Sequence, residues 1–491
     1  MRTRWRAAHV LAYQNGGHVL LRDGEVVWED DTLVHVGPRY DGPPVDVDRD
    51  LGEALVLPGL IDLDALTDID HLVLDSWASP EHGPGLQWSR DYFDRSRDVF
   101  TAEERAFVRE YALTQLALHG ITTYMPIASE VHSAWAETYD DLRAMADVSR
   151  RLGLRGYLGP SYRSGVNVVH ADGRRGVAFD EERGRAGLRD AERFLEYACA
   201  LGDPLVNGAL LPCRIETLTP DLMQATAALA LRRDVPVRLH CLQGTLERQL
   251  VREAHGCTPL ELLARTGLLG TRLVVPHGIV LDVHPGVHGE DRGDLAVLAR
   301  AGVSVVHCPQ TSLRYGDVLH SFGRYRRAGI NLALGTDSFP PDLIRGMDMG
   351  VHLAKVVDGS ADAAPAEAYV EAATLGGARA LGRTDLGRIE PGAQADLVAF
   401  RLDDLRDGVL DDPVRTLLLN GTARQAAHSV VAGRRVLVDG RIPGVDTDAL
   451  RRRAQALFGK MRTAYGERDV QGRGADELFP PTFPPFEETP R

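Results

Sequence analysis

Short apolar runs recur along the middle of the chain, and several of them end abruptly in a polar residue. Eight such runs are candidate strands, near residues 55–63, 120–127, 154–162, 205–213, 235–241, 272–278, 303–308 and 330–336. Longer amphipathic stretches, such as 101–119 and 221–233, lie between them and are expected to be helices. Apolar strands that alternate with helices are typical of parallel βα units, and eight units close a barrel. The pattern predicts the α/β class, with a (β/α)8 TIM-like barrel.

The two ends of the chain have a different pattern, in which short strands are separated by turns. Near the N-terminus, the segment Arg22-Asp23-Gly24 is expected to be a hairpin turn. The expected strands at the two ends lie at 18–21, 25–28, 33–36, 396–400, 427–431 and 435–438. They predict a flanking β-sandwich that is built from both chain termini.

These patterns divide the chain into three parts. Residues 1–56 and 388–466 form the composite β-sandwich, residues 57–387 form the barrel, and residues 467–491 form a proline-rich tail. The tail contains Phe479-Pro-Pro-Thr-Phe-Pro-Pro-Phe486, where proline excludes both a regular helix and a central strand. We therefore expect the tail to be disordered or loosely docked.

Three of the expected barrel strands end in a side chain that can ligate a metal ion. Two strands end in His240 and His277, and the last one delivers Asp337 at its C-terminal end. The carboxyl ends of barrel strands meet at one rim, where catalytic residues gather. Imidazole and carboxylate together suit borderline metal ions and the activation of water. The sequence alone thus favours a metal-dependent hydrolase, although Asp337 would also suit a helix N-cap.

Composition narrows the range of partners and locations. The 491 residues carry a formal net charge of −14 without a long basic run, which argues against nucleic-acid and anionic-membrane partners. The chain has no apolar run of about 18 residues, no signal-like N-terminus, and five cysteines without short paired spacing. We expect a cytoplasmic protein with a small-molecule or modified-peptide substrate. Lysine occurs only at Lys355 and Lys460, which is typical of a high-GC bacterial source.

An ordered series of motifs runs through most of the chain. The motifs are Leu57-Pro-Gly-Leu-Ile-Asp62, Gly120-Ile-Thr-Thr123, His307-Cys-Pro309, Leu334-Gly-Thr-Asp-Ser338, the segment 373–382 and the segment 389–398. Together with His240 and His277, this series resembles the amidohydrolase superfamily, in its cytosine deaminase and chlorohydrolase-like branch. The resemblance implies a metal-dependent hydrolase of C–N bonds other than peptide bonds, and it leaves a homodimer open.

Two positions depart from the pattern of that family. The family follows its first motif with a His-x-His pair that holds the metal, where this chain has Asp64-Ala65-Leu66. A buried carboxylate at Asp64 should either bind a cation or pair with an arginine such as Arg163. The family's deaminases also carry a glutamate three residues after the fifth-strand histidine, where this chain has Gln243, which cannot titrate.

The resemblance and the strand tips together give a candidate ligand set. We expect one divalent ion, zinc first and iron, manganese or cobalt as alternatives, held by His240, His277, Asp337 and Asp64. Such an ion lowers the pKa of a water molecule toward about 7. Asp337 would accept the proton of that water and His277 would orient or polarise it, so these two are the candidate catalytic residues.

Four further residues are candidates for substrate binding. Arg163 could bind a substrate carboxylate in a bidentate manner, and Tyr162 could donate to a carbonyl. Gln243 offers an amide, and the family uses the position of His307 for packing and substrate contacts. For Arg163, a salt bridge with an acidic neighbour is the alternative.

Three functions remain open at this point. The first is hydrolysis of an amide, an amidine, a cyclic amide or an aminated heterocycle. A variant of it is a tailoring hydrolase of peptide natural products that opens or trims a macrocyclic amidine. The others are a metal-free enzyme and a substrate-binding pseudoenzyme on the same barrel, and metal analysis separates these from the first.

Overall fold

The computed structural model describes residues 1–69, 88–127, 133–422 and 424–486. Eight short parallel strands in its centre occupy the segments that the sequence pattern predicts. They are β6 (Leu60–Leu66), β7 (Ile121–Ile127), β8 (Arg155–Leu158), β12 (Val206–Gly208), β14 (Val237–Arg238), β15 (Leu273–Pro276), β16 (Ser304–His307) and β17 (Asn331–Leu334). The predicted α/β barrel is thus confirmed.

Hydrogen bonds place the strands around the barrel in sequence order. The strands pair as β12-β8-β7-β6 and β14-β15-β16-β17. A parallel bridge between Leu210 and Val237 joins the two halves on one side. On the other side, the backbone N–H of Asp337 donates to the carbonyl of Asp64 at 2.8 Å. This second contact brings the tips of the first and last strands together.

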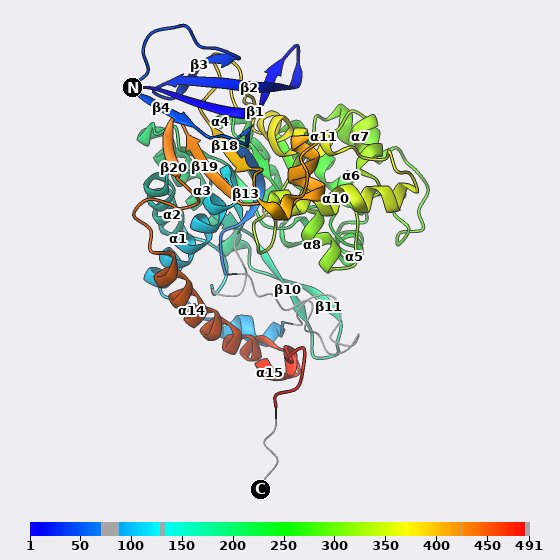
Figure 1. The fold of residues 1–491 in the computed structure, drawn as a ribbon. Coiled ribbons are helices and arrows are strands. Elements are labelled where there is room, and N and C mark those ends of the chain that lie inside the picture. Colours follow the sequence, from blue (N-terminus) through cyan, green and yellow to red (C-terminus); the bar gives the residue numbers. More distant parts are fainter. Residues whose placement is uncertain (70–87, 128–132, 423, 487–491) are drawn as a thin grey trace.

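Helices between the strands form the outer layer (Figure 1). The main ones are α1 (Ala102–Leu118), α2 (Tyr139–Leu152), α3 (Glu181–Leu201), α4 (Pro220–Arg233), α5 (Thr245–His255), α6 (Pro259–Arg265), α7 (Asp294–Arg300) and α10 (Leu343–Asp358). Local sequence sets several of their ends. Thr101 and Glu104 form a capping box at the start of α1, and Gly153 ends α2 in the left-handed conformation.

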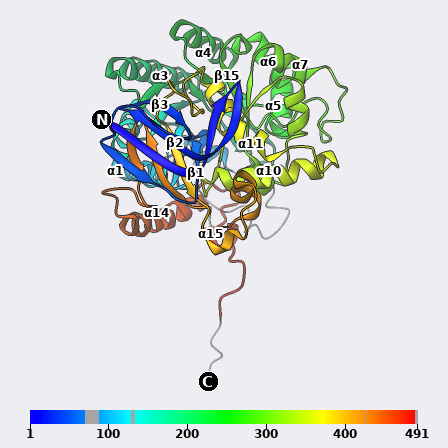
Figure 2. The ribbon, with the colours of Figure 1, turned by 45° about the horizontal axis from the view of Figure 1, so that its top comes forward.

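The termini contribute one eight-stranded sheet that covers the barrel on the side of the strand N-termini (Figure 2). Its order is β20-β19-β18-β5-β1-β2-β3, with β4 beside β1. The strands are β1 (Arg2–Gln14), β2 (Gly17–Glu29), β3 (Thr32–Gly37), β4 (Val47–Asp50), β5 (Ala54–Pro58), β18 (Leu397–Arg401), β19 (Ala426–Val431) and β20 (Arg434–Leu437). The sheet curls over a core of its own. Strands β18 and β5 lie between β19 and β1 in the sheet, yet the ring centroids of Trp5 on β1 and His428 on β19 are only 6.1 Å apart.

The predicted hairpin turn at Arg22-Asp23-Gly24 is wrong. These residues lie within β2, where Asp23 has a φ of 47° and is not paired with β1, although the register on either side of it is the same. The true turn is Asn15-Gly16, with φ values of 53° and 88°. Asn-Gly favours the two-residue turn that joins twisted antiparallel strands. The hairpin therefore turns at Asn15-Gly16 and not at Asp23-Gly24.

A buried ion pair ties the terminal sheet to the barrel. Arg155 on β8 donates from Nε and Nη2 to the two carboxylate oxygens of Asp396, both at 3.0 Å. Nη1 of Arg155 donates to the carbonyl of Pro204, and the backbone N–H of Ala432 donates to Asp396. Both charged groups are therefore fully paired although both are buried.

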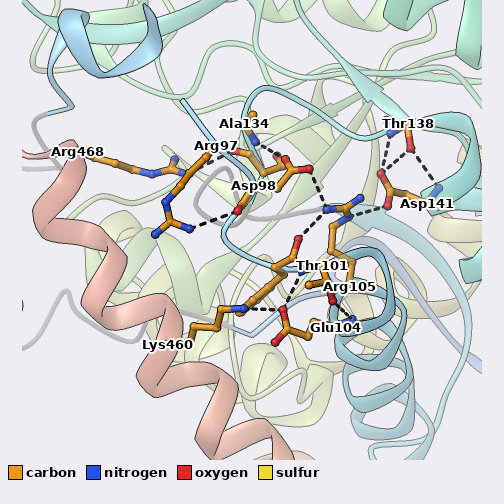
Figure 3. Close-up of polar contacts among 12 residues, drawn as sticks. Arg97, Asp98, Thr101, Glu104, Arg105, Ala134, Thr138, Asp141, Lys460 and Arg468 are labelled. Atoms are coloured by element: carbon orange, nitrogen blue, oxygen red, sulfur yellow. Dashed lines mark hydrogen bonds and ion pairs between the residues drawn. The ribbon is translucent and has the colours of Figure 1, made fainter. Parts of the chain in front are cut away.

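The C-terminal part of the chain crosses to the opposite end of the barrel (Figure 1). Helix α14 (Thr447–Arg468) runs beside α1 and does not belong to the terminal sheet. Figure 3 shows the contact between Lys460 of α14 and Glu104 of α1, at 2.7 Å. The segment expected to extend the β-sandwich to residue 466 is therefore helical.

The tail is ordered over its first part, contrary to the expected disorder or loose docking. The short helix α15 (Ala475–Leu478) follows α14, and Phe479 is buried with its ring 4.9 Å from that of Tyr465. Phe483 and Phe486, further along, are 80% and 92% exposed. One aromatic anchor thus docks the tail before the proline-rich segment leaves the surface.

The C-terminal segment lies at the same end of the barrel as the strand tips. A hairpin of β10 (Gly165–Val169) and β11 (Arg175–Phe179) projects from this end beside α15 (Figure 1). Trp88 and Ser89 connect the two, through bridges to Asp469 and Val169. Among the described residues, no helix combines the length and apolar character that crossing a bilayer requires.

Candidate metal centre

Four side chains from four barrel strands meet at the carboxyl end of the barrel. Asp64 lies near the end of β6, and His240, His277 and Asp337 follow β14, β15 and β17. Each offers one ligand atom, and these atoms all lie within 4.8 Å of one another. The structure therefore brings together all four residues that the sequence suggested as metal ligands.

The backbone at two of these residues is strained. His277 and Asp337 have φ values of 69° and 49°, in the left-handed region that side-chain-bearing residues rarely adopt. Such a conformation costs about 1–3 kcal/mol and persists where surrounding contacts enforce it, as at many functional sites. Here the hydrogen bond from Asp337 N–H to Asp64 is one such contact. The strand tips are thus turned inward, toward the common centre.

The alternative role of Asp337 as a helix N-cap is not realised. Asp342 caps α10, and its side chain accepts from the backbone N–H of Arg345. Asp337 lies five positions earlier in the sequence, and its carboxylate faces His277. Its side chain is 13% exposed, so it is the most accessible of the four carboxylate and imidazole groups.

The nitrogen and oxygen atoms that face one another in this cluster are of the kinds that ligate metal ions. His240 Nδ1 lies 3.1 Å from the carbonyl of Cys213, which can only accept, so Nδ1 carries the proton. Its Nε2 lies 3.3 Å from Oδ2 of Asp64. His277 Nε2 is buried without a hydrogen-bond partner among the described residues, 3.5 Å from Oδ2 of Asp337.

A metal ion fits this arrangement better than protonated imidazoles do. Burial, together with the neighbouring His240, lowers the pKa of His277 to about 3, so this imidazole is neutral near pH 7. Two imidazoles and two carboxylates form a donor set that suits zinc and related divalent ions. His240, His277, Asp337 and Asp64 would hold such an ion.

Asp64 has partners on both of its oxygens. Oδ1 accepts from Nη1 of Arg238 at 3.0 Å, and Oδ2 faces His240 and, at 3.7 Å, the thiol of Cys308. Burial alone would raise the pKa of Asp64, but the adjacent His240 and Arg238 hold it below its usual range. Asp64 is therefore an ionised carboxylate, as a metal ligand must be.

A second buried aspartate supports the cluster from below. Asp62 accepts hydrogen bonds from the backbone N–H and the hydroxyl of Thr336, at 3.1 and 2.7 Å, and from the N–H of Asp64 at 3.1 Å. Burial raises its pKa to about 7. It joins β6 to the loop that carries Asp337, and so fixes two ligand positions relative to each other.

Gln243 lies beside the centre and is held by an arginine. Its side-chain oxygen accepts a hydrogen bond from Nη1 of Arg214. Because arginine only donates, the amide oxygen must face Arg214 and the NH₂ group points away from it. The backbone N–H groups of Leu242 and Gln243 donate to the carboxylate of Glu247, at 2.8 and 3.0 Å. Burial and the nearby Glu216 raise the pKa of Glu247 to about 8.

Two of the expected substrate-binding residues are placed differently from the expectation. Tyr162 is fully buried and its hydroxyl is 2.8 Å from that of Thr226 on α4, so it packs between strand and helix. His307 is also buried, and its ring packs near Phe322 and Tyr369 behind the strand. Neither side chain can contact a substrate, because each points out of the barrel.

The other expected residues have mixed outcomes. Arg163 donates to the carbonyl of Trp135, and its guanidinium carbon lies 5.6 Å from the centre of the Trp135 ring. These contacts are with a loop residue outside the four-residue cluster. Arg163 is not the arginine that pairs with Asp64. Asp68 is buried and accepts from the N–H of Ile69. Asp70 and His71, which follow Asp64 closely in the sequence and could replace the family's missing histidine, lie outside the described residues.

Sequence reasoning missed Arg238, Arg214 and Cys308. Arg238 could have been found, because residues two apart on a strand share a face and His240 was already placed in the barrel. The same alternation puts Cys308 on the inner face when His307 faces outward. Arg214 follows a short strand whose end could not be located closely enough from the sequence.

Comparisons with known proteins show the family to which the chain belongs. A model of the amidohydrolase family matches residues 55–440. The chain is 30% identical to a 5-methylthioadenosine/S-adenosylhomocysteine deaminase of Halobacterium salinarum, over 92% of this chain and 98% of the relative. It is 28% identical to an 8-oxoguanine deaminase of Pseudomonas aeruginosa, over 90% of this chain and 94% of that protein. The chain belongs to the amidohydrolase family.

Solved structures with the same fold include two that contain zinc. An adenosine deaminase from Xanthomonas campestris with bound zinc superposes with a TM-score of 0.76 at 24% identity, covering 94% of this chain and 98% of the other. An atrazine chlorohydrolase mutant from Arthrobacter aurescens, complexed with zinc and atraton, gives 0.75 at 21% identity, covering 93% and 100%. These likenesses show a common barrel.

Proposed function

We propose that this amidohydrolase removes nitrogen from an aminated heterocycle or a cyclic amidine by attack of water on the carbon of a C–N bond. The observation that carries the proposal is the cluster of Asp64, His240, His277 and Asp337 at the strand tips. A divalent ion bound there, zinc in the first place, would supply a water molecule of lowered pKa and neutralise charge on the substrate. The deaminase relatives support the choice of substrate class.

Asp337 is the residue placed to move the proton. It is the most exposed of the four carboxylate and imidazole groups in the cluster, and it lies beside His277. In the proposed reaction, the water oxygen bonds to the substrate carbon while Asp337 takes the water proton. The C–N bond then breaks, and the leaving nitrogen takes the proton back from Asp337. His277 is neutral, and as a ligand of the ion it would orient the attacking water.

Gln243 restricts the substrate further. Its oxygen accepts from Arg214, which leaves its N–H donors for a substrate. A glutamate in the same place could take up a proton, whereas this amide cannot. We therefore expect the substrate to place an acceptor, such as a carbonyl oxygen or an unprotonated ring nitrogen, beside the scissile carbon.

Two measurements test the function. Protein purified without chelator should contain close to one equivalent of a divalent metal by elemental analysis. Ammonia release from aminated purines, including 5-methylthioadenosine and 8-oxoguanine, and from cyclic amidines should then be followed with metal-loaded protein. Less than about 0.1 equivalent of metal in folded protein from supplemented medium would reject the metal centre, since such sites bind tightly in folded hosts.

Location is a secondary part of the proposal. All five cysteines are free, and Cys241, Cys257 and Cys308 are buried. Free thiols in a large chain are typical of a reducing compartment. This supports a cytoplasmic enzyme, which fractionation of the source cells would test.

A further inference from the structure

Arg238 occupies an unusual place for a charged residue, in the interior of the barrel. Its side chain is 1% exposed and crosses from β14, the fifth barrel strand, to Asp64 on β6, the first. Nη1 donates both to Oδ1 of Asp64 at 3.0 Å and to the carbonyl of Pro126 on β7 at 2.8 Å. The guanidinium thus spans the floor beneath the candidate metal centre.

The position of Arg238 relative to His240 defines how Asp64 can act. The two residues are two apart in the sequence, so both point into the barrel. Arg238 binds Oδ1 of Asp64 from below, and His240 faces Oδ2 at 3.3 Å. One oxygen of Asp64 is therefore committed to the arginine, and the other is directed at the centre.

The charges of the cluster lead to the same conclusion. Asp64 and Asp337 bring two carboxylates to one site at the strand tips. Arg238 returns one positive charge at hydrogen-bonding distance from Asp64. Burying a carboxylate without a partner is costly, so the arginine allows Asp64 to remain in place before any ion binds.

We infer that Arg238 is a positioning residue of the metal centre, which holds Asp64 as a one-oxygen ligand and balances its charge. This inference rests on the proposed metal centre. It predicts that a bound ion can partly replace Arg238, because both neutralise the same carboxylate. A guanidinium with a purely structural role would not be replaceable in this way.

The chain contains a matched control for this test. Arg155 and Asp396 form a second buried ion pair, also with a shortest distance of 3.0 Å, at the opposite end of the barrel. That pair is bidentate, and each partner has further hydrogen bonds, so an ion at the strand tips cannot substitute for it. Arg155→Met thus removes a buried arginine without touching the centre.

The experiment compares wild type, Arg238→Met and Arg155→Met, each with and without added zinc or cobalt at pH 8. We expect both variants to lower the Tm of metal-free protein. The Tm gain on metal addition should be larger than in wild type only for Arg238→Met, and its metal affinity in chelator competition should rise about tenfold or more. The acid limb of its kcat/KM profile should move to higher pH, because the site has lost a positive charge.

The double variant Asp64→Asn with Arg238→Met keeps the test valid if Arg238→Met alone does not fold. It removes both charges, so metal-free protein should melt near the wild-type temperature but bind metal at least about a hundredfold more weakly. Two outcomes would overturn the inference about Arg238 and leave the proposed function standing. One is an equal metal-induced Tm gain in Arg238→Met and Arg155→Met, and the other is wild-type metal affinity in the double variant. Wild-type protein that binds no metal would instead reject the proposed function, and this inference with it.

Discussion

The buried ion pairs Arg155–Asp396 and Arg238–Asp64 have the same chemistry and different surroundings. In the pair between Arg155 and Asp396, both carboxylate oxygens are bound by the arginine, and the backbone of Ala432 adds a third hydrogen bond. In the pair between Arg238 and Asp64, only Oδ1 is bound by arginine. Oδ2 of Asp64 faces His240 and Cys308 instead.

The difference separates a structural carboxylate from a functional one. A fully paired buried carboxylate has no remaining capacity for a ligand, and it serves to join the terminal sheet to the barrel. A half-paired one keeps an oxygen for an ion while its charge is already partly balanced. The same ion pair can therefore fasten two domains or prepare a metal site, depending on how many lone pairs it leaves open.

The structural pair gives the largest expected effect on stability. Arg155→Met should lower the free energy of unfolding by about 3–5 kcal/mol, because Asp396 would remain buried without its charge partner. Denaturant unfolding of metal-loaded protein measures this loss. The turnover of the protein that stays folded should match wild type, and a proportional loss of turnover would contradict the division of roles.

A substitution in the metal-binding cluster should reduce turnover and leave stability nearly unchanged. Asp337→Asn keeps the shape of the side chain but cannot take up the water proton, so kcat should fall by more than about a hundredfold. The melting temperature of metal-free protein should change little, because Asp342 and not Asp337 caps the following helix. A clear drop in melting temperature with preserved turnover would assign Asp337 to the structural class.

Metal removal should lower the free energy of unfolding by less than the loss of Arg155 does. A ligand present at about a hundred times its Kd stabilises a folded protein by about 2.7 kcal/mol. Dialysis against a chelator should thus lower the melting temperature of wild type and abolish turnover, and zinc should restore both. Asp64→Asn should show a much reduced response, since it loses the charged ligand atom. An unchanged response would remove Asp64 from the ligand set.

The barrel and the four central side chains could be predicted from the sequence because both follow from strand ends. Buried strands appear as apolar runs, and a polar residue at the end of such a run must lie at the rim. His240, His277 and Asp337 needed no further information. The family likeness then directed attention to Asp64, where the expected histidine is absent.

Side-chain direction near those ends could not be predicted as well. A shift of one residue turns a side chain from the inside of the barrel to the outside. Tyr162 and His307 lie on the outer side, whereas the neighbour Cys308 lies inside. The docking of Phe479 against Tyr465 was also hidden, because proline content excludes regular structure without excluding a single aromatic anchor.

Gln243 gives the smallest expected effect and tests whether the centre works without a glutamate there. Its side chain is held by Arg214 and can only donate toward the substrate. Gln243→Ala should therefore reduce kcat/KM by about tenfold, which corresponds to one lost hydrogen bond of about 1 kcal/mol. Gln243→Glu should not create efficient turnover of cytosine or chlorotriazines. The first-strand side still offers Asp64, with one oxygen bound to Arg238, and the aliphatic Leu66. Steady-state kinetics on metal-loaded variants decide the question, and efficient deamination of those heterocycles by the glutamate variant would show that the first-strand difference matters little.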